Sequence, residues 1–489
     1  MKALIAAPFK LGDFIQLTPV LEGLQEAYEE LYLWCTQPAV AEAARLRGQF
    51  AGIIEAGAND ERLPEKLPLD KISAVCNYSS GRPAVVLLDW IRTHYPKIRL
   101  LGPQLKGDRI ALPRPQALAK DLMTISRRLS PFNLVDIWRR ADPDLNPGRR
   151  LSWPRPAGTR PEAAALRASP ADSPTAAPVP AASADSAASS LNSPTAAGSA
   201  KPEASGSRTP ASQSASLGRP PDRIGLVPGA GSSRRRWPKE NFLALAEAVL
   251  AVPDTEIVLL GSRPERTLGR ALTEGLEQNP RVINLMGETN LKQLGDITAG
   301  LKVLVSGDTG VMHLGAALGT PLVSLFFGPA AARETGPYGE GHQIVQAWAP
   351  CAPCAESSPC QWRTCRDIPE AGLAAGLVLK ALHKTPAGLE APLPEGREIY
   401  TAVLDDFGWQ LKLQAAEANF EQWTASLVLE AARAAVEPLY NPRKPALPPS
   451  EKKPAAMKSL LQSLESGLHL EPARKTRFLA VFNDLAASF

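Results

Sequence analysis

The stretch Val303-Leu304-Val305-Ser306-Gly307-Asp308-Thr309-Gly310-Val311-Met312-His313 decides the fold of this chain. Three apolar residues come first, then small and polar turn residues, then a helical pattern that begins near Gly310. This order predicts a buried strand, a tight turn and a helix whose first N–H groups point out from the edge of a sheet. It is typical of a doubly wound sheet that binds an anion at such a turn.

The same alternation of strands and helices extends over most of the chain. Because strands that alternate with helices form parallel sheets with crossover connections, we predict two doubly wound α/β sheets. In the first part, strands are expected at 3–7, 31–34, 52–55, 74–77, 98–101 and 108–111, and a helix at 17–28. In the second part, strands are expected at 223–228, 256–260, 282–285, 303–306 and 321–326, and helices at 240–250, 264–275, 291–299 and 310–318.

Residues 154–221 are dominated by Pro, Ala, Ser and Thr and separate the two α/β parts. This composition buries too little apolar surface to offset the entropy of ordering, so we expect a disordered linker. A glycosylated stalk is the alternative, and it would require an extracellular location. The predicted domains are a Rossmann-like domain at 1–153, the linker, a second Rossmann-like domain with a cysteine cluster at 222–388, and a helical extension at 389–489.

Length and charge narrow the class of protein. A chain of 489 residues is longer than one core usually supports, so two domains with appendages are expected. A net charge of +4 is too small to suggest a nucleic-acid-binding protein. Residues 95–150 carry 12 Lys or Arg against 5 Asp or Glu. This region is either a solvated basic face or a contact surface for an anionic acceptor or membrane leaflet.

The apolar runs of the chain bear on its location. No run approaches the ~18 apolar residues that span a bilayer, and the stretch Met1–Pro8 has no signal-peptide pattern. We therefore expect a cytoplasmic protein with mostly reduced cysteines, which contacts a membrane at most peripherally.

The first candidate site follows the first strand, at Lys10-Leu11-Gly12-Asp13. Gly12 permits a tight turn, and Asp13 lies near a helix N-terminus, where the helix dipole favours its ionised form. Asp13 is therefore either a helix cap or a carboxylate that faces the ligand crevice. The region lacks the glycine patterns of dinucleotide-binding and P-loop proteins.

Two further loops have the composition of anion sites. Pro228-Gly229-Ala230-Gly231-Ser232-Ser233 offers backbone N–H groups, and three arginines, Arg234 to Arg236, follow directly. In the loop 306–310, Thr309 and Gly310 suit close contact with a phosphate, and Asp308 suits sugar hydroxyls. His313 could donate to a phosphate oxygen, although a single histidine on a helix is as often a core residue. For the arginines, the alternative is a solvated charge run.

Four cysteines form a cluster near the end of the second α/β part. Cys351, Cys354, Cys360 and Cys365 have the spacing C-x2-C-x5-C-x4-C. In a reducing compartment, four thiols this close together favour a closed, structural zinc or iron site over disulfides. Free or redox-active thiols are the alternative.

Together these motifs resemble those of glycosyltransferase family 9, the lipopolysaccharide heptosyltransferases. The matching segments are 10–19, 228–238, 287–291, 306–317 and 327–329. The cysteine cluster followed by Arg366-Asp367-Ile368 is similar to the subgroup that adds the second heptose. The resemblance implies the GT-B architecture, in which two Rossmann-like domains bind the acceptor and the donor on the two sides of a cleft.

The resemblance also implies roles for individual residues. Asp13 matches the general base, which takes the proton of the acceptor hydroxyl as that oxygen attacks the anomeric carbon with inversion. The donor-binding residues that it implies are Arg235, Thr309, Gly310 and His313 near the diphosphate, Asp308 near the sugar, and Glu265 near the nucleoside. Helix N-termini and cationic side chains would stabilise the leaving diphosphate, so no cofactor is expected for catalysis.

The resemblance to this family leaves three alternative functions. The first is transfer of heptose from ADP-heptose to a lipid-linked saccharide acceptor, the lipopolysaccharide inner core. The second is a related nucleotide-sugar transferase that glycosylates a protein or another surface glycan, which would suit the long linker and the extension. The third is a non-catalytic scaffold, which would not need Asp13 as a base.

Overall fold

The computed structural model describes residues 1–57, 60, 62–112, 133–139, 141–142, 145–154, 220–349, 351–360, 363–383, 397–405 and 408–416. Nearly all of the predicted linker and most of the predicted C-terminal extension lie outside these residues. The described parts of residues 1–161 and 221–489 belong to one compact unit that contains both large sheets.

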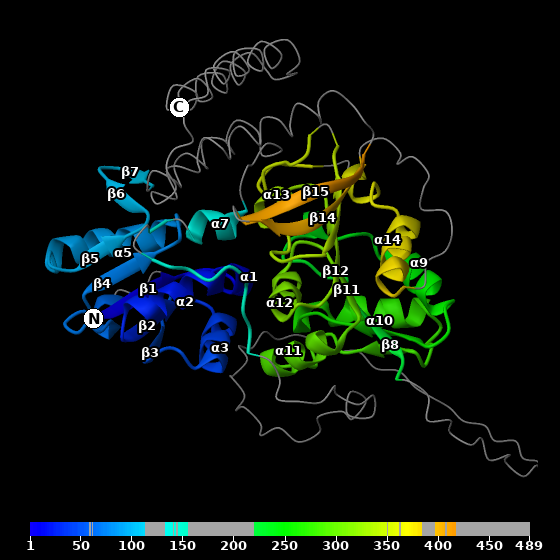
Figure 1. The fold of residues 1–489 in the computed structure, drawn as a ribbon, viewed down its shortest axis with the longest axis horizontal. Helices are drawn as coiled ribbons and strands as arrows, with labels where there is room; N and C mark the ends of the chain where they lie inside the picture. Colours follow the sequence, from blue (N-terminus) through cyan, green and yellow to red (C-terminus); the bar gives the residue numbers. More distant parts are fainter. Residues whose placement is uncertain are drawn as a thin grey trace, which may run out of the picture. The chain divides into compact units, whose positions relative to one another are not determined.

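The first sheet has 5 strands, all parallel, in the order β3-β2-β1-β4-β5 (Figure 1). Its strands are β1 (Lys2–Ala7), β2 (Glu30–Cys35), β3 (Gly52–Glu55), β4 (Ala74–Asn77) and β5 (Arg99–Leu101). The helices are α1 (Leu11–Gln16), α2 (Thr18–Ala27), α3 (Pro38–Arg47), α4 (Leu63–Lys66), α5 (Arg82–His94) and α7 (Leu134–Arg139). Residues 3–7 of β1 are fully buried, as expected for a central strand covered on both faces.

One expectation for this part of the chain was wrong in detail. The strand expected at 108–111 does not join the sheet: β6 (Gln104–Lys106) and β7 (Arg109–Ala111) form a separate antiparallel hairpin. The reason is the turn at Gly107-Asp108, where Gly107 has a φ of 59° and reverses the chain after three residues. The helix expected at 17–28 is confirmed as α2, with Pro19 in its first turn, and the short helix α1 precedes it.

The second sheet has 8 strands in the order β10-β9-β8-β11-β12-β13-β14-β15. Its strands are β8 (Asp222–Val227), β9 (Thr255–Leu259), β10 (Val282–Asn284), β11 (Val303–Ser306), β12 (Leu322–Phe326), β13 (Gln343–Ala347), β14 (Arg397–Asp405) and β15 (Gly408–Ala416). The helices are α9 (Lys239–Leu250), α10 (Arg266–Gly275), α11 (Leu291–Gly300), α12 (Gly310–Leu318), α13 (Ala332–Thr335) and α14 (Ala371–Ala381). Short 3-10 helices are η2 (Ser233–Arg235), η3 (Arg263–Glu265) and η4 (Thr364–Arg366).

The order of the strands reverses at one place in each sheet. In the first sheet this switch point lies between β1 and β4, and in the second it lies between β8 and β11. In doubly wound sheets, ligands bind at the carboxyl ends of the strands beside the switch point. The loops after β8 and β11 therefore occupy the position of a ligand site, and the predicted class, α/β with two Rossmann-like sheets as in GT-B, is confirmed.

The predicted helical extension at 389–489 was wrong over its first described part. Residues 397–405 and 408–416 are strands: β14 pairs antiparallel with β13, and β15 pairs antiparallel with β14 (Figure 1). The run Ile399-Tyr400-Thr401-Ala402-Val403 is rich in β-branched and aromatic residues, which favour a strand. Periodicity also favours a strand in β15, where Trp409, Leu411 and Leu413 alternate with polar residues.

A buried carboxylate connects this hairpin with α7. Asp136, which is 1% exposed, accepts hydrogen bonds from the Tyr338 hydroxyl at 2.8 Å and from the backbone N–H of Trp409 at 3.0 Å. Nη1 of Arg139 lies 3.2 Å from the same carboxylate. A buried charge requires several partners of this kind, so the three contacts fix α7, the loop at 338 and the start of β15 against one another.

Candidate active site

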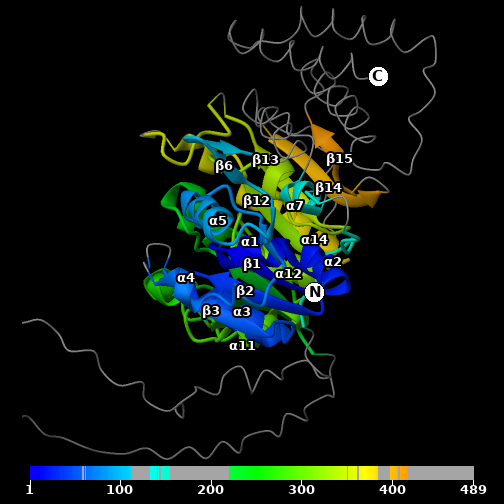
Figure 2. The same cartoon turned by 90° about the vertical axis from the view of Figure 1, so that its left-hand side faces the viewer.

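Helix α1, which carries Asp13, packs against helix α12, which begins at Gly310. Figures 1 and 2 both place α1 beside α12. A Cβ atom on Gly310 would lie 3.5 Å from the backbone nitrogen of Gly12, so the two glycines bring the two backbones into close contact. A second contact between the same parts of the chain joins α3 and α11, where the backbone N–H of Leu291 donates to Oε1 of Glu42 at 3.0 Å.

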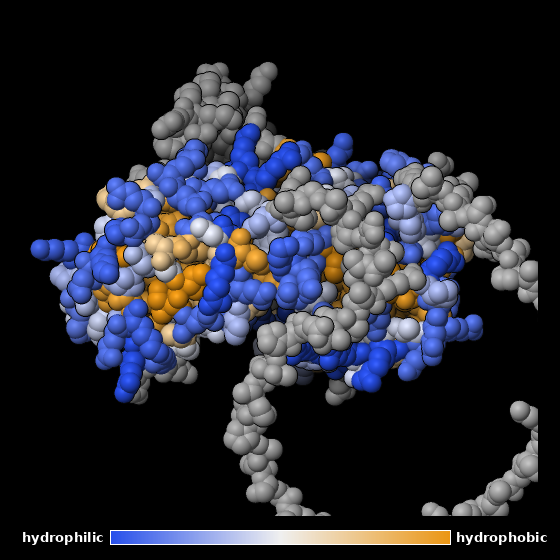
Figure 3. Space-filling view, turned by 90° about the horizontal axis from the view of Figure 1, so that it is seen from below, coloured by the Kyte–Doolittle hydropathy of each residue, from blue (hydrophilic) through white to orange (hydrophobic). Residues whose placement is uncertain are grey.

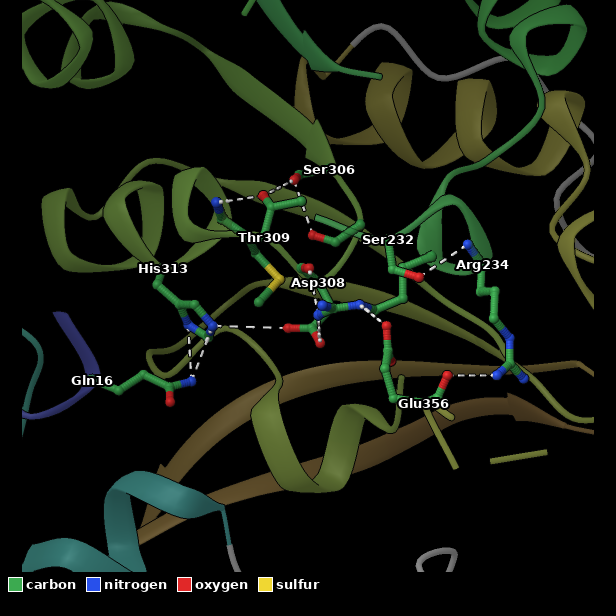
Figure 4. A network of polar contacts seen from close by, with 11 residues as sticks. Gln16, Ser232, Arg234, Ser306, Asp308, Thr309, His313 and Glu356 are labelled. Carbon is green, nitrogen blue, oxygen red and sulfur yellow. Dashed lines mark hydrogen bonds and ion pairs between the residues drawn. The ribbon is translucent and has the colours of Figure 1, made fainter. Parts of the chain in front are cut away.

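The turn between β11 and α12 has the structure of a phosphate-binding turn. Thr309 is the N-cap of α12, and its hydroxyl accepts a hydrogen bond from the backbone N–H of Met312 at 3.3 Å. The Ser306 hydroxyl lies 2.9 Å from the Thr309 hydroxyl (Figure 4). The remaining first N–H groups of α12 and its dipole make this end of the helix favourable for an anion.

Asp308 and Arg235 form an ion pair across the switch point. Nη1 of Arg235, from η2 after β8, lies 3.0 Å from Oδ2 of Asp308, which follows β11. The two side chains are only 20% and 13% exposed, so solvent screens the pair weakly. Glu356 lies on the other side of the guanidinium, with its Oε1 3.7 Å from Nε of Arg235 (Figure 4).

Asp13 lies close enough to this pair to interact with it electrostatically. Burial raises the pKa of the Asp13 carboxyl, and the negative charge of Asp308 raises that pKa further. The backbone N–H of Lys10 donates to Oδ2 of Asp13 at 3.3 Å and lowers the pKa, as do the charges of Lys10 and Arg235. A carboxylate with a raised pKa next to a candidate phosphate turn is suited to accept a proton.

His313 is a buried residue of α12 that contacts α1. Its side chain is buried, and burial lowers the pKa of its imidazole to about 4, so the ring is neutral at pH 7. The amide nitrogen of Gln16 lies 3.1 Å from Nδ1 and 3.0 Å from Nε2 of this ring (Figure 4). Sequence reasoning missed Gln16, although its place on α1 four residues after Gly12 was visible in the sequence.

The three arginines after the loop 228–233 have three different environments. Arg235 faces Asp308, and Arg236 donates to the carbonyl of Ala230 at 3.5 Å. Arg234 points toward the cysteine loop, which we define as residues 351–360 (Figure 4). Its guanidinium donates to the carbonyls of residues 355, 356 and 358 at 2.9, 2.8 and 2.6 Å and to Sγ of Cys354 at 2.8 Å. Only Arg235 therefore joins the group around Asp308.

Glu265 lies at the ends of two neighbouring strands rather than beside Asp308. Its carboxylate accepts from the backbone N–H and the hydroxyl of Ser262 at 2.8 and 2.7 Å and so caps η3. A Cβ atom on Gly229, after β8, would lie 1.9 Å from Oε1 of Glu265. Glycine at this position therefore leaves the space that the carboxylate occupies. The predicted contact of Glu265 with a nucleoside stays a prediction.

In the described part of the chain, the four cysteines of the predicted metal site form no disulfide, and Cys351 is exposed while Cys365 is buried. Sγ of Cys365 lies near Gly328, where a Cβ atom would be 3.8 Å from the sulfur. Among the described residues, no group of three or more His, Cys, Asp or Glu side chains has the arrangement of a metal site. The zinc or iron expected from the spacing stays a prediction.

Within the described part of the chain, helices fall short of the length and apolar character needed to cross a membrane. On the face drawn in Figure 3, hydrophilic side chains lie between and around patches of apolar ones. Of the basic residues between 95 and 150, Arg150 pairs with Glu340 and Arg139 pairs with the buried Asp136. At least two basic side chains of this region therefore form ion pairs within the protein.

The fold and this geometry define an α/β protein with a candidate anion site at the switch point of a doubly wound sheet. Residues 178–361 match the sequence model of glycosyltransferase family 9 (heptosyltransferase). The predicted resemblance to this family is therefore confirmed over that part of the chain.

Individual heptosyltransferases are similar to part of the chain. The chain is 34% identical to lipooligosaccharide heptosyltransferase 2 of Haemophilus influenzae over 137 residues, which are 27% of this chain and 39% of the relative. It is 34% identical to lipopolysaccharide heptosyltransferase 2 of Escherichia coli over 126 residues, 25% of this chain and 36% of the relative. The match thus spans less than two fifths of the length of either relative.

Among solved structures, the chain is similar to the ADP-heptose lipopolysaccharide heptosyltransferase II of Escherichia coli. The TM-score is 0.49 and the sequence identity 18%, and the alignment covers 78% of this chain and 98% of that structure.

Proposed function

We propose that this protein is an inverting glycosyltransferase that transfers heptose from ADP-heptose to a lipopolysaccharide inner-core acceptor. One observation carries the proposal: the contact of Gly12 with Gly310 places the Asp13 carboxylate next to the turn formed by Asp308 and Thr309. A base for the acceptor and an anion site for the donor are thereby close together. The family match over residues 178–361 supports the choice of heptose as the sugar.

In the proposed reaction, Asp13 takes the proton of the acceptor hydroxyl while that oxygen forms a bond to the anomeric carbon of the donor. The bond between this carbon and the diphosphate oxygen breaks at the same time, and the electron pair leaves with ADP. The N-terminus of α12 and the guanidinium of Arg235 stabilise the charge that develops on the diphosphate. Asp308 accepts hydrogen bonds from the sugar hydroxyls, and Glu265 contacts the nucleoside.

The proposed acceptor is a lipid-linked saccharide, which the protein would meet as a peripheral enzyme at the cytoplasmic leaflet. The described basic side chains Arg109 and Arg149, in the region 95–150, would lie on the side of the acceptor. The four cysteines are proposed to contribute a structural metal and no step of the reaction.

The test is release of nucleoside diphosphate by the purified full chain. ADP-heptose, UDP-sugars and GDP-sugars are each supplied with a Kdo–lipid A acceptor, with a candidate protein acceptor, or with none. We expect rapid ADP release only with ADP-heptose and the lipid acceptor, and its loss in Asp13→Asn but not in the exposed control Asp70→Asn. Release only with a UDP- or GDP-sugar rules out heptose, release only with the protein acceptor identifies the second function, and no release with any donor refutes the enzyme.

A further inference from the structure

Two residues of α1 contact the imidazole ring of His313. Gly12 and Gln16 are four residues apart and therefore lie on the same face of the helix. A Cβ atom on Gly12 would lie 3.1 Å from Cδ2 of His313, so glycine leaves room for one edge of the ring. The amide nitrogen of Gln16 lies 3.1 Å from Nδ1 and 3.0 Å from Nε2. The ring is thus held between a backbone contact and an amide of one helix.

Gln16 is a buried polar residue, and its amide contacts His313. Gln16 is 1% exposed and His313 is 4% exposed. Oε1 of Gln16 has no hydrogen-bond partner among the described residues. An unbonded buried oxygen is unfavourable, and an apolar side chain of similar size would avoid it. Retention of the amide at this cost points to the contact that its nitrogen makes with His313.

The surroundings of the ring determine which nitrogen accepts this hydrogen bond. A neutral imidazole has one N–H donor and one acceptor nitrogen, and the Gln16 amide nitrogen can donate only to the acceptor. Nε2 of His313 lies 3.9 Å from Oδ1 of Asp308, and a carboxylate favours a proton on the nitrogen that faces it. Asp308 therefore favours the proton on Nε2, which leaves Nδ1 as the acceptor within reach of the Gln16 amide nitrogen.

We propose that Gln16 is a positioning residue that fixes His313 in the tautomer with the proton on Nε2. The N–H group of this tautomer faces the turn of Asp308 and Thr309, where it can donate to a donor phosphate. This role rests on the proposed function, because it requires a diphosphate at the turn. The same contact holds α1, and with it Asp13, in register with α12.

Burial keeps the ring neutral, although charged groups lie around it. The charged groups of the elements packed there are Asp308 from the turn, Asp13 from α1 and Arg235 from η2. Burial lowers the pKa of His313 to about 4, against the opposing effect of Asp308. A neutral ring has one acceptor nitrogen, which is the condition under which the Gln16 amide selects the tautomer.

The tautomer can be measured without any substrate. The chain has 5 histidines, so NMR of protein labelled with 13C and 15N in histidine gives few signals, and His313→Gln assigns the one of interest. We expect the Nε2–H tautomer in the wild type, unchanged from pH 5.5 to 8. Gln16→Leu should give a mixture of tautomers, and Gln16→Glu should raise the pKa of His313 so that the ring becomes protonated in this range. A wild type with the proton on Nδ1, or the same tautomer in Gln16→Leu, overturns the proposal.

Kinetics then test whether the tautomer matters for transfer. Loss of one hydrogen bond of this kind should lower kcat of Gln16→Leu about three- to tenfold, with little change in KM of the acceptor. Gln16→Glu is nearly isosteric and serves if the leucine variant does not fold. Its pH–rate profile should show an ionisation of His313 that is absent from the wild type.

The control is Gln25, an exposed residue of α2, in the variants Gln25→Leu and Gln25→Glu, which should behave as the wild type. If the wild type transfers no sugar, the proposed function fails while the NMR result still decides the contact. If the tautomer changes and kcat does not, the positioning role of Gln16 is wrong and the proposed function stands.

Discussion

Nη1 of Arg235 lies 3.0 Å from Oδ2 of Asp308 and 3.3 Å from the backbone oxygen of the same residue. The two residues follow β8 and β11, the strands on either side of the switch point. The guanidinium is thereby oriented before any ligand binds, with part of its donor fork left for an anion.

Replacement of Arg235 by alanine should weaken binding of ADP. Loss of hydrogen bonds from a charged group predicts an increase in Kd of about tenfold or more. Arg235→Lys keeps the charge but not the planar fork, so its loss should be smaller. Calorimetry with ADP measures both variants, and Arg270→Ala, an exposed arginine of α10, is the control. Equal Kd values in the wild type and Arg235→Ala would show that Arg235 does not contact the diphosphate.

The activity should fall at acidic pH with the protonation of Asp13. Because burial raises the pKa of this carboxyl, the ionised base is lost at a higher pH than for an exposed aspartate. Asp308→Asn removes a negative charge that raises the Asp13 pKa, so the acidic limb of kcat/KM should move to lower pH. A pH–rate profile of each protein, scaled to its own maximum, measures the shift. A limb that moves to higher pH, or does not move, contradicts the assigned base.

Arg234 should hold the cysteine loop in a conformation that slows alkylation of its thiols. Its guanidinium holds three carbonyls and the sulfur of Cys354, so Arg234→Ala should let the loop open and speed alkylation of Cys354 by about tenfold. Mass spectrometry after timed treatment with iodoacetamide gives the rate for each cysteine. Arg236→Ala, whose guanidinium instead bonds the carbonyl of Ala230, is the matched control. Equal rates in Arg234→Ala and the control would mean that the loop does not depend on Arg234.

The spacing of the four cysteines predicts about one zinc or iron per chain. Elemental analysis of protein purified without chelators measures the content, and the double variant Cys351→Ser, Cys354→Ser should lose it. Thermal unfolding should begin at a lower temperature in that variant if the metal is structural. A wild type without metal would refute the metal site.

Asp136 should be important for stability. Asp136→Ala removes a buried acceptor of three hydrogen bonds and leaves Arg139 without its carboxylate, which predicts a loss of about 3–5 kcal/mol. Chemical unfolding gives the free energy of unfolding, and Asp70→Ala is the exposed control. A loss no greater than that of the control would show that the contacts of Asp136 contribute little to stability.

Much of the fold was predictable because local signals agreed. Runs such as Val303-Leu304-Val305 are apolar enough to be buried strands, and the turns after them contain the glycines and N-caps that start helices. The strand expected at 303–306 and the helix at 310–318 have these bounds in the structure. The hairpin of β14 and β15 was missed although the alternation of apolar and polar residues in β15 has the period of a strand.

The site was predictable as a set of residue types but not as a set of contacts. Arg234, Arg235 and Arg236 are equivalent in sequence, and only the path of η2 and the cysteine loop directs them to different partners. The contact of Gln16 with His313 joins residues 297 positions apart, so no local pattern indicates it. Contacts of this range depend on packing between elements, which periodicity does not describe.

The hairpin of β14 and β15 lies at the rim of the larger sheet, beyond β13. A sheet gains strands at its rim without any shift of the strands at its centre, since each new strand bonds only to the last one. Among the described strands β15 is the last at this rim, and its exposed Lys412 places a charge there, which discourages pairing with a second molecule, whereas the apolar Leu413 is also 40% exposed. The hairpin therefore lies four or more strands from the turn after β8 and does not pair directly with the strands at the switch point. We expect the rim to tolerate changes of length and sequence that the centre does not tolerate.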